Sequence, residues 1–179
     1  MESTSTPQIN IYIDKEKLEW LKYSISRFDT YYQSVNSKIA LYITLSTFII
    51  TAASAGGTTI IKQLDHNRNG PVLFLTLIII AAAVAIFFTI KASIPYLKNH
   101  RESIFYFGYV SDLSHNDYEQ KVKNLTIENN LDDLLCQAQL LAKGLKSKYF
   151  SLQIAGYLLL VDFAFITILS LLIITNIQQ

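Results

Sequence analysis

The stretch VLFLTLIIIAAAVAIFFTI, residues 72–90, decides the fold of this chain. It forms the core of 22 uncharged residues between Arg68 and Lys91. As an α-helix with a rise of about 1.5 Å per residue, that length reaches ~33 Å, and the hydrocarbon core of a bilayer is about 30 Å thick. Gly70 and Pro71 come directly before it, as is typical of a turn that leads into a helix. We therefore predict a membrane span at residues 71–91.

Two further segments are long and apolar enough for the same role. The 23 residues from Ile39 to Ile61 carry no charge, and after Lys148 the only charged side chain is Asp162. Buried helices of soluble proteins rarely run so far without a charge. We predict spans at 39–61 and 149–175, with an external loop at 62–70 and an external tail at 176–179.

The distribution of positive charge predicts the orientation. Lys and Arg number 5 before the first span, 2 in the loop between the first two spans, and 8 from Lys91 to Lys148. Positively charged flanks stay on the cytoplasmic side of a membrane. We expect the N-terminus and residues 92–148 to be cytoplasmic. No signal-peptide pattern precedes the first span, so we expect the N-terminus to be retained.

The cytoplasmic segments carry apolar stripes with helical spacing. After a flexible tail at 1–13, the stripe in residues 14–38 predicts a helix that leads directly into the first span. A second stripe begins after Asn130, the expected N-cap, and predicts a helix that continues from residue 131 into the third span. The two stripes are Leu18, Leu21, Ile25, Phe28, Tyr32 and Val35, and Leu131, Leu134 or Leu135, Ala138, Leu141 and Leu145.

Between these helices, residues 100–114 predict a shorter amphipathic helix, and residues 114–130 a polar connection with a short helix. The expected fold is an all-α membrane protein, in which three transmembrane helices carry long helices that extend into a cytoplasmic bundle.

The composition and motifs argue against several classes of function. Only 16% of residues are charged and the formal net charge is +1, so no strong field would attract a nucleic acid polymer. The three histidines and the single Cys136 lack metal-ligand spacing, and no phosphate-cradling glycine loop occurs. We expect no catalytic residues, no metal and no cofactor, and therefore no enzyme.

Polar side chains inside the spans are the candidates for a function in the bilayer. Thr44, Thr47, Thr51 and Ser54 form a stripe on the first span, and such a stripe either lines a wet path or packs helices together. Asp162 lies ~15 Å below the cytoplasmic boundary, at the depth of Thr51.

Two interpretations of Asp162 stay open. It is either a protonated carboxyl group that is hydrogen-bonded to Thr51, or one member of a ring of carboxylates around a path. Three spans are too few to enclose a sizeable pore, so a path requires a homo-oligomer.

Two stretches carry a family resemblance. SIFYFGYVSDLS at 103–114 and QAQLLAKGLKSKYFSLQIAGYLLL at 137–160, together with the order of the predicted helices, resemble the transmembrane effectors of Pycsar anti-phage defence. The chain departs from that pattern where such proteins often have Asp-x-Lys before the first span, because it has Asn36-Ser37-Lys38 there.

The resemblance implies a bacterial inner-membrane protein that a cyclic pyrimidine mononucleotide, cCMP or cUMP, activates to impair the membrane in abortive infection. Such a ligand needs a cation for its phosphate and a flat surface for its base. The candidate ligand-binding residues are Arg101, Lys98, His100, Tyr106 and Arg27. A solvated charge at Arg101 and packing of the aromatic residues in the core are the simpler interpretations. The chain lacks the alternating strands of a cyclic-nucleotide-binding β-roll.

Two other functions remain compatible with the sequence. One is a membrane scaffold whose cytoplasmic helices bind a partner protein. The other is a constitutive small channel subunit that uses Asp162 and needs no nucleotide.

Overall fold

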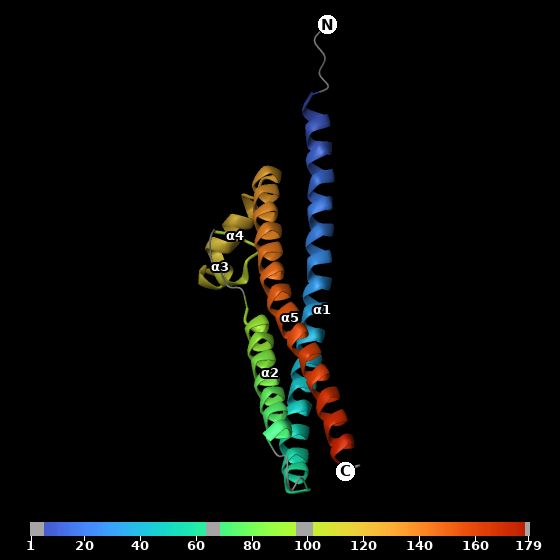
Figure 1. Ribbon diagram of the computed structural model, residues 1–179. Helices are drawn as coiled ribbons and strands as arrows, with labels where there is room; N and C mark the ends of the chain where they lie inside the picture. Colours follow the sequence, from blue (N-terminus) through green and yellow to red (C-terminus); the bar gives the residue numbers. More distant parts are fainter. Residues whose placement is uncertain (1–5, 64–68, 96–101, 178–179) are drawn as a thin grey trace. The chain divides into compact units, whose positions relative to one another are not determined.

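The computed structural model describes residues 6–63, 69–95 and 102–177, and all regular structure in these ranges is helical (Figure 1). The helices are α1 (Thr6–Gln63), α2 (Asn69–Ser93), α3 (Phe107–Asp112), α4 (His115–Lys123) and α5 (Ile127–Ile177). By length and composition, three of them can cross a membrane, over Lys15–Lys62, Asn69–Ser93 and Ile127–Thr175. The predicted all-α membrane protein with three spans is confirmed.

The chain divides into two compact units. The bundle unit contains the described residues of Met1–Tyr32 and Pro95–Lys146, and the span unit those of Gln33–Ile94 and Ser147–Gln179. Helices α1 and α5 each continue from one unit into the other without a break, as the two apolar stripes predict.

The helix starts differ from the sequence-based prediction. Helix α1 begins at Thr6 and not near Asp14, and Pro7 is accommodated in its first turn, where the missing N–H costs no hydrogen bond. Helix α5 begins at Ile127, since Thr126 and not Asn130 is the N-cap. The Thr126 hydroxyl accepts a hydrogen bond from the Asn129 N–H at 3.2 Å.

The predicted helix at 100–114 is shorter than expected, and only Phe107–Asp112 is helical. Residues 103–106 form a turn in which the Tyr106 N–H donates to the Ser103 carbonyl at 3.2 Å. Helix α4 follows directly, and Ser114 caps it by accepting from the Asp117 N–H at 3.2 Å.

Both predicted cytoplasmic stripes are buried or half-buried, with one exception. Leu134 is 6% exposed and Leu135 is 50% exposed, so Leu134 is the member of the second stripe. In the span unit, the core is Ile49, Leu75, Ile78, Ala82, Ala85, Leu159 and Leu169. Because lipid chains are as apolar as leucine, such a core is held by close packing, which the small side chains of Ala82 and Ala85 permit.

Candidate functional site

Asp162 is enclosed within the span unit. Its side chain is fully buried, and neither carboxylate oxygen has a hydrogen-bond partner among the described residues. The predicted bond to Thr51 is not formed, because Asp162 is buried while Thr51 is exposed on α1, where its hydroxyl donates to the Thr47 carbonyl at 2.9 Å. An unpaired carboxylate at membrane depth is costly, so this position is destabilising in the conformation observed.

Ser46 on α1 is a second enclosed polar group, and sequence analysis missed it. It is fully buried, and its hydroxyl oxygen has no partner in the part of the chain that the structure describes. Ser46 lies one turn from Ile49, and Asp162 one turn from Leu159, in the same apolar core. The burial of Ser46 could have been predicted from the sequence, because Ser46 lies three residues before Ile49 and therefore on the same face of the helix.

The hydroxyl stripe lies on the outer face of α1. Thr44, Thr47, Thr51 and Ser54 are all exposed in the single chain. The Thr44 hydroxyl donates to the Ala40 carbonyl at 2.9 Å, in the same way that Thr51 bonds to its own helix. The structure therefore does not bring this stripe together with Asp162, which faces the core.

The Lys148-Tyr149 pair joins α5 to the two other helices of the span unit. The buried Lys148 ammonium donates to the carbonyls of Ala92 and Ile94, the latter at 3.2 Å, and so satisfies the C-terminal end of α2. The Lys38 ammonium lies 5.3 Å from the centre of the Tyr149 ring. The sequence predicted only that the first span begins after Lys38 and the third after Lys148.

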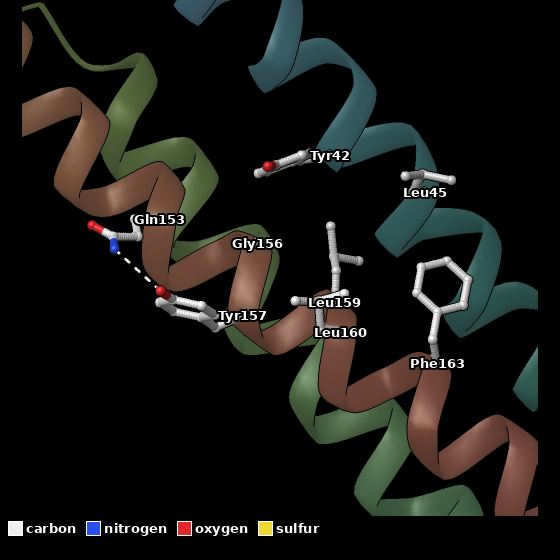
Figure 2. Close-up of a pocket in the computed structure, with 8 residues that line it drawn as sticks. All are labelled: Tyr42, Leu45, Gln153, Gly156, Tyr157, Leu159, Leu160 and Phe163. Carbon is white, nitrogen blue, oxygen red and sulfur yellow. Dashed lines mark hydrogen bonds between the residues drawn. The ribbon is translucent and has the colours of Figure 1, made fainter.

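A groove runs between α1 and α5 in the span unit (Figure 2). It has a volume of about 430 Å³, and its lining includes Tyr42 and Leu45 from α1 and Gly156 and Phe163 from α5. A Cβ atom at Gly156 would lie 3.1 Å from the Tyr42 hydroxyl oxygen, so glycine lets that tyrosine lie against α5. The groove is mainly apolar and can hold an acyl chain or an apolar side chain.

In the bundle unit, the turn at 103–106 is fixed to α5 by side chains. The Ile104 N–H donates to Asp133 Oδ2 at 3.2 Å, and Gln137 Nε2 donates to the buried Ser103 hydroxyl at 2.8 Å. Helix α1 is joined to α5 nearby, because the Tyr32 hydroxyl donates to the Leu141 carbonyl at 3.0 Å. These bonds set the position of the aromatic residues that follow Ser103.

Three of the predicted ligand residues, Lys98, His100 and Arg101, lie outside the described residues. Arg27 is exposed and donates to the Tyr31 hydroxyl at 2.8 Å, which raises the pKa of the guanidinium. No described contact joins Arg27 to Tyr106, the remaining predicted residue.

Tyr106 precedes α3, and its ring lies against Gly108. A Cβ atom at Gly108 would lie 2.6 Å from Tyr106 Cε1, so this packing requires glycine. Tyr106 is therefore half-buried, and its neighbours Phe105 and Phe107 are the exposed rings, at 50% and 70%.

Glu102, Tyr109 and Lys121 form a surface cluster that the sequence did not predict. Glu102 Oε2 accepts from the Lys121 ammonium at 2.9 Å and from the Tyr109 hydroxyl at 3.1 Å. Lys121 and Tyr109 together lower the pKa of Glu102, and hydrogen bonds with Tyr109 and Glu102 raise the pKa of Lys121. The Lys121 charge is thus already paired.

Comparison with known proteins identifies the family. The family model described as the Pycsar effector protein domain matches residues 20–175, which include α2, α3, α4 and most of α1 and α5. No curated protein and no solved structure matches the chain. The matched region includes both stretches that carry the resemblance and all three apolar helices. The chain therefore belongs to the Pycsar effector family, which implies a membrane protein with an effector role in anti-phage defence.

Proposed function

We propose that this bacterial effector senses cCMP or cUMP through its cytoplasmic helices, then oligomerises or rearranges and impairs the inner membrane, causing abortive infection. The family match over residues 20–175 carries the proposal. The output is a change in the bilayer and not a reaction product, so the mechanism needs no catalytic residue, metal or cofactor.

The proposed location is the inner membrane with a cytoplasmic N-terminus. Lys and Arg are concentrated before the apolar part of α1 and between α2 and the apolar part of α5. This distribution supports a bundle unit in the cytoplasm, where a nucleotide messenger is made.

Continuous helices provide a route for the signal. Helices α1 and α5 each have residues in the bundle unit and residues in the span unit, with no loop between them. A ligand that shifts or rotates either helix in the bundle therefore acts directly on the same helix in the membrane.

The burial of Asp162 favours an opening of the span unit over the assembly of rigid subunits. The carboxylate is enclosed by its own chain, so subunits that kept this conformation would also keep Asp162 away from any shared path. The exposed hydroxyl stripe on α1 supplies a polar face for the neighbouring copy. Activation accordingly combines homo-oligomerisation with separation of α1, α2 and α5.

A membrane-potential assay tests the proposal. Cells that express the full chain are given a cyclase that makes cCMP or cUMP, and a potential-sensitive dye is followed. We expect depolarisation only with an active cyclase, and cells with a catalytically dead cyclase are the control. An unchanged potential would favour the scaffold, and depolarisation in the control cells would favour the constitutive channel.

A further inference from the structure

A groove in the bundle unit has the dimensions and lining of a small-molecule site. Its volume is about 520 Å³, within the roughly 300–1,000 Å³ typical of ligand pockets. Three separate parts of the chain line it. They are α1 with Lys22, Ser26 and Asp29, the turn before α3 with Phe105, and α5 with Asn130 and Leu134.

Asn130 supplies the strongest indication of a missing ligand. Its amide oxygen is buried and has no hydrogen-bond donor among the described residues. Buried acceptors are normally paired, because an unpaired acceptor has lost its water and gained nothing in return. Asn130 does not cap α5, a role that Thr126 performs, so helix capping does not account for this asparagine.

Phe105 offers a flat apolar surface to the same groove. Its ring is 50% exposed and makes no described contact with another aromatic ring. The backbone on either side of it is fixed, since Ser103 and Ile104 are bonded to α5 through Gln137 and Asp133. A half-exposed ring on a backbone that is held in place is suited to stacking against a nucleobase.

The polar residues of α1 lie along one face of the helix. Lys22, Ser26 and Asp29 are separated by four and three residues, so their side chains follow one another along the groove. Among the described residues, the Lys22 ammonium forms an ion pair with the exposed Glu19, at 3.0 Å. Exposed pairs of this kind are weak, so Lys22 can turn to an anion in the groove.

We propose that this groove binds the cyclic pyrimidine mononucleotide, with the base on Phe105 and Asn130, the phosphate on Lys22 and the ribose 2′-hydroxyl on Asp29. The identity of the ligand rests on the proposed function. An asparagine amide matches either base, because its oxygen accepts from cytosine N4–H or uracil N3–H while its nitrogen donates to cytosine N3 or a uracil carbonyl. The bound ligand joins α1, the turn at 103–106 and α5.

The test compares Asn130→Leu with Asn129→Leu in the full-length protein in nanodiscs. Asn129 is exposed, precedes Asn130 directly and does not line this groove. Calorimetric titration with cCMP and with cUMP should give at least about tenfold weaker binding for Asn130→Leu, as expected for one lost hydrogen-bonded contact, and wild-type affinity for Asn129→Leu. The melting temperature of ligand-free Asn130→Leu should be equal to or above that of the wild type, because the variant loses an unpaired buried oxygen.

Two results would overturn the assignment. Wild-type affinity in Asn130→Leu would exclude this groove and leave the proposed function intact. If the wild-type protein bound neither cCMP nor cUMP, both the proposed binding site and the proposed function would be wrong.

Discussion

The ammonium of Lys148 on α5 donates a hydrogen bond to the carbonyl of Ala92 near the end of α2. The contact lies between segments far apart in the sequence, and it satisfies carbonyls that have no partner within their own helix. A positive charge at the C-terminal end of a helix also interacts favourably with the helix dipole. Lys148 thus stabilises the packing of α2 against α5 at one end of the span unit.

Replacement of Lys148 by methionine should destabilise the span unit by about 1–2 kcal/mol, because the last carbonyls of α2 lose their donor. Thermal unfolding in detergent measures the change, and Lys146→Met is the control because Lys146 is exposed on the same helix. Equal melting temperatures for the two variants would show that the hydrogen bonds from Lys148 to the end of α2 contribute nothing to stability.

Replacement of Gly108 by alanine should destabilise the bundle unit by about 1–3 kcal/mol, because the added Cβ would overlap the Tyr106 ring. The matched control is Gly70→Ala, since a Cβ at Gly70 meets nothing within 4 Å. Hydrogen exchange across residues 103–112 should increase in the first variant only. Restored protection in the double variant Tyr106→Ala, Gly108→Ala would assign the effect to this one contact.

Replacement of Asp162 by leucine should raise the stability of the span unit by about 1–3 kcal/mol, because it removes a buried carboxylate that has no partner. The variant should insert normally and no longer depolarise cells that make cCMP or cUMP. Ser46→Ala removes the unpaired buried hydroxyl that the described part of the span unit also contains, and this variant should retain depolarisation. Full activity of Asp162→Leu would show that the carboxylate has no part in membrane impairment.

The cluster of Glu102, Tyr109 and Lys121 should respond weakly to acid. The pKa of Glu102 is lowered in the folded state, so its contribution to stability is present above the ordinary glutamate pKa and is lost as the pH falls through the lowered value. Because Glu102 is 74% exposed, the effect should be small. Hydrogen exchange of α3 and α4 between about pH 3 and pH 6 measures it, and Glu102→Gln should show no such dependence.

The long elements were predictable because each rests on many residues. The three spans are predicted by long uncharged runs, and the two continuous helices by repeated apolar spacing. Both patterns include so many residues that one atypical side chain does not change the prediction. Leu134 and Leu135 were indistinguishable, since adjacent leucines fit the same stripe until the packing partner is known. The N-cap was misplaced because Thr126 and Asn130 both suit that role and stand only one turn apart.

The candidate site was less predictable than the fold. Depth along a span can be counted, and it placed Asp162 beside Thr51. The rotation of each helix about its own axis does not follow from residue counts. In the structure, this rotation points Asp162 into the core and Thr51 away from the core. The sequence marked Asn130 only as an N-cap for a related reason, because only the folded chain shows that its amide oxygen lacks a donor.

The outward stripe on α1 has a further consequence for permeation. Thr44 and Thr51 use their hydroxyl protons to bond carbonyls of their own helix, so each presents only oxygen lone pairs to its surroundings. A row of such oxygens is electronegative without carrying a formal charge, much like the carbonyl-lined filters of ion channels. Any aqueous path bordered by this face of several copies would therefore pass cations in preference to anions.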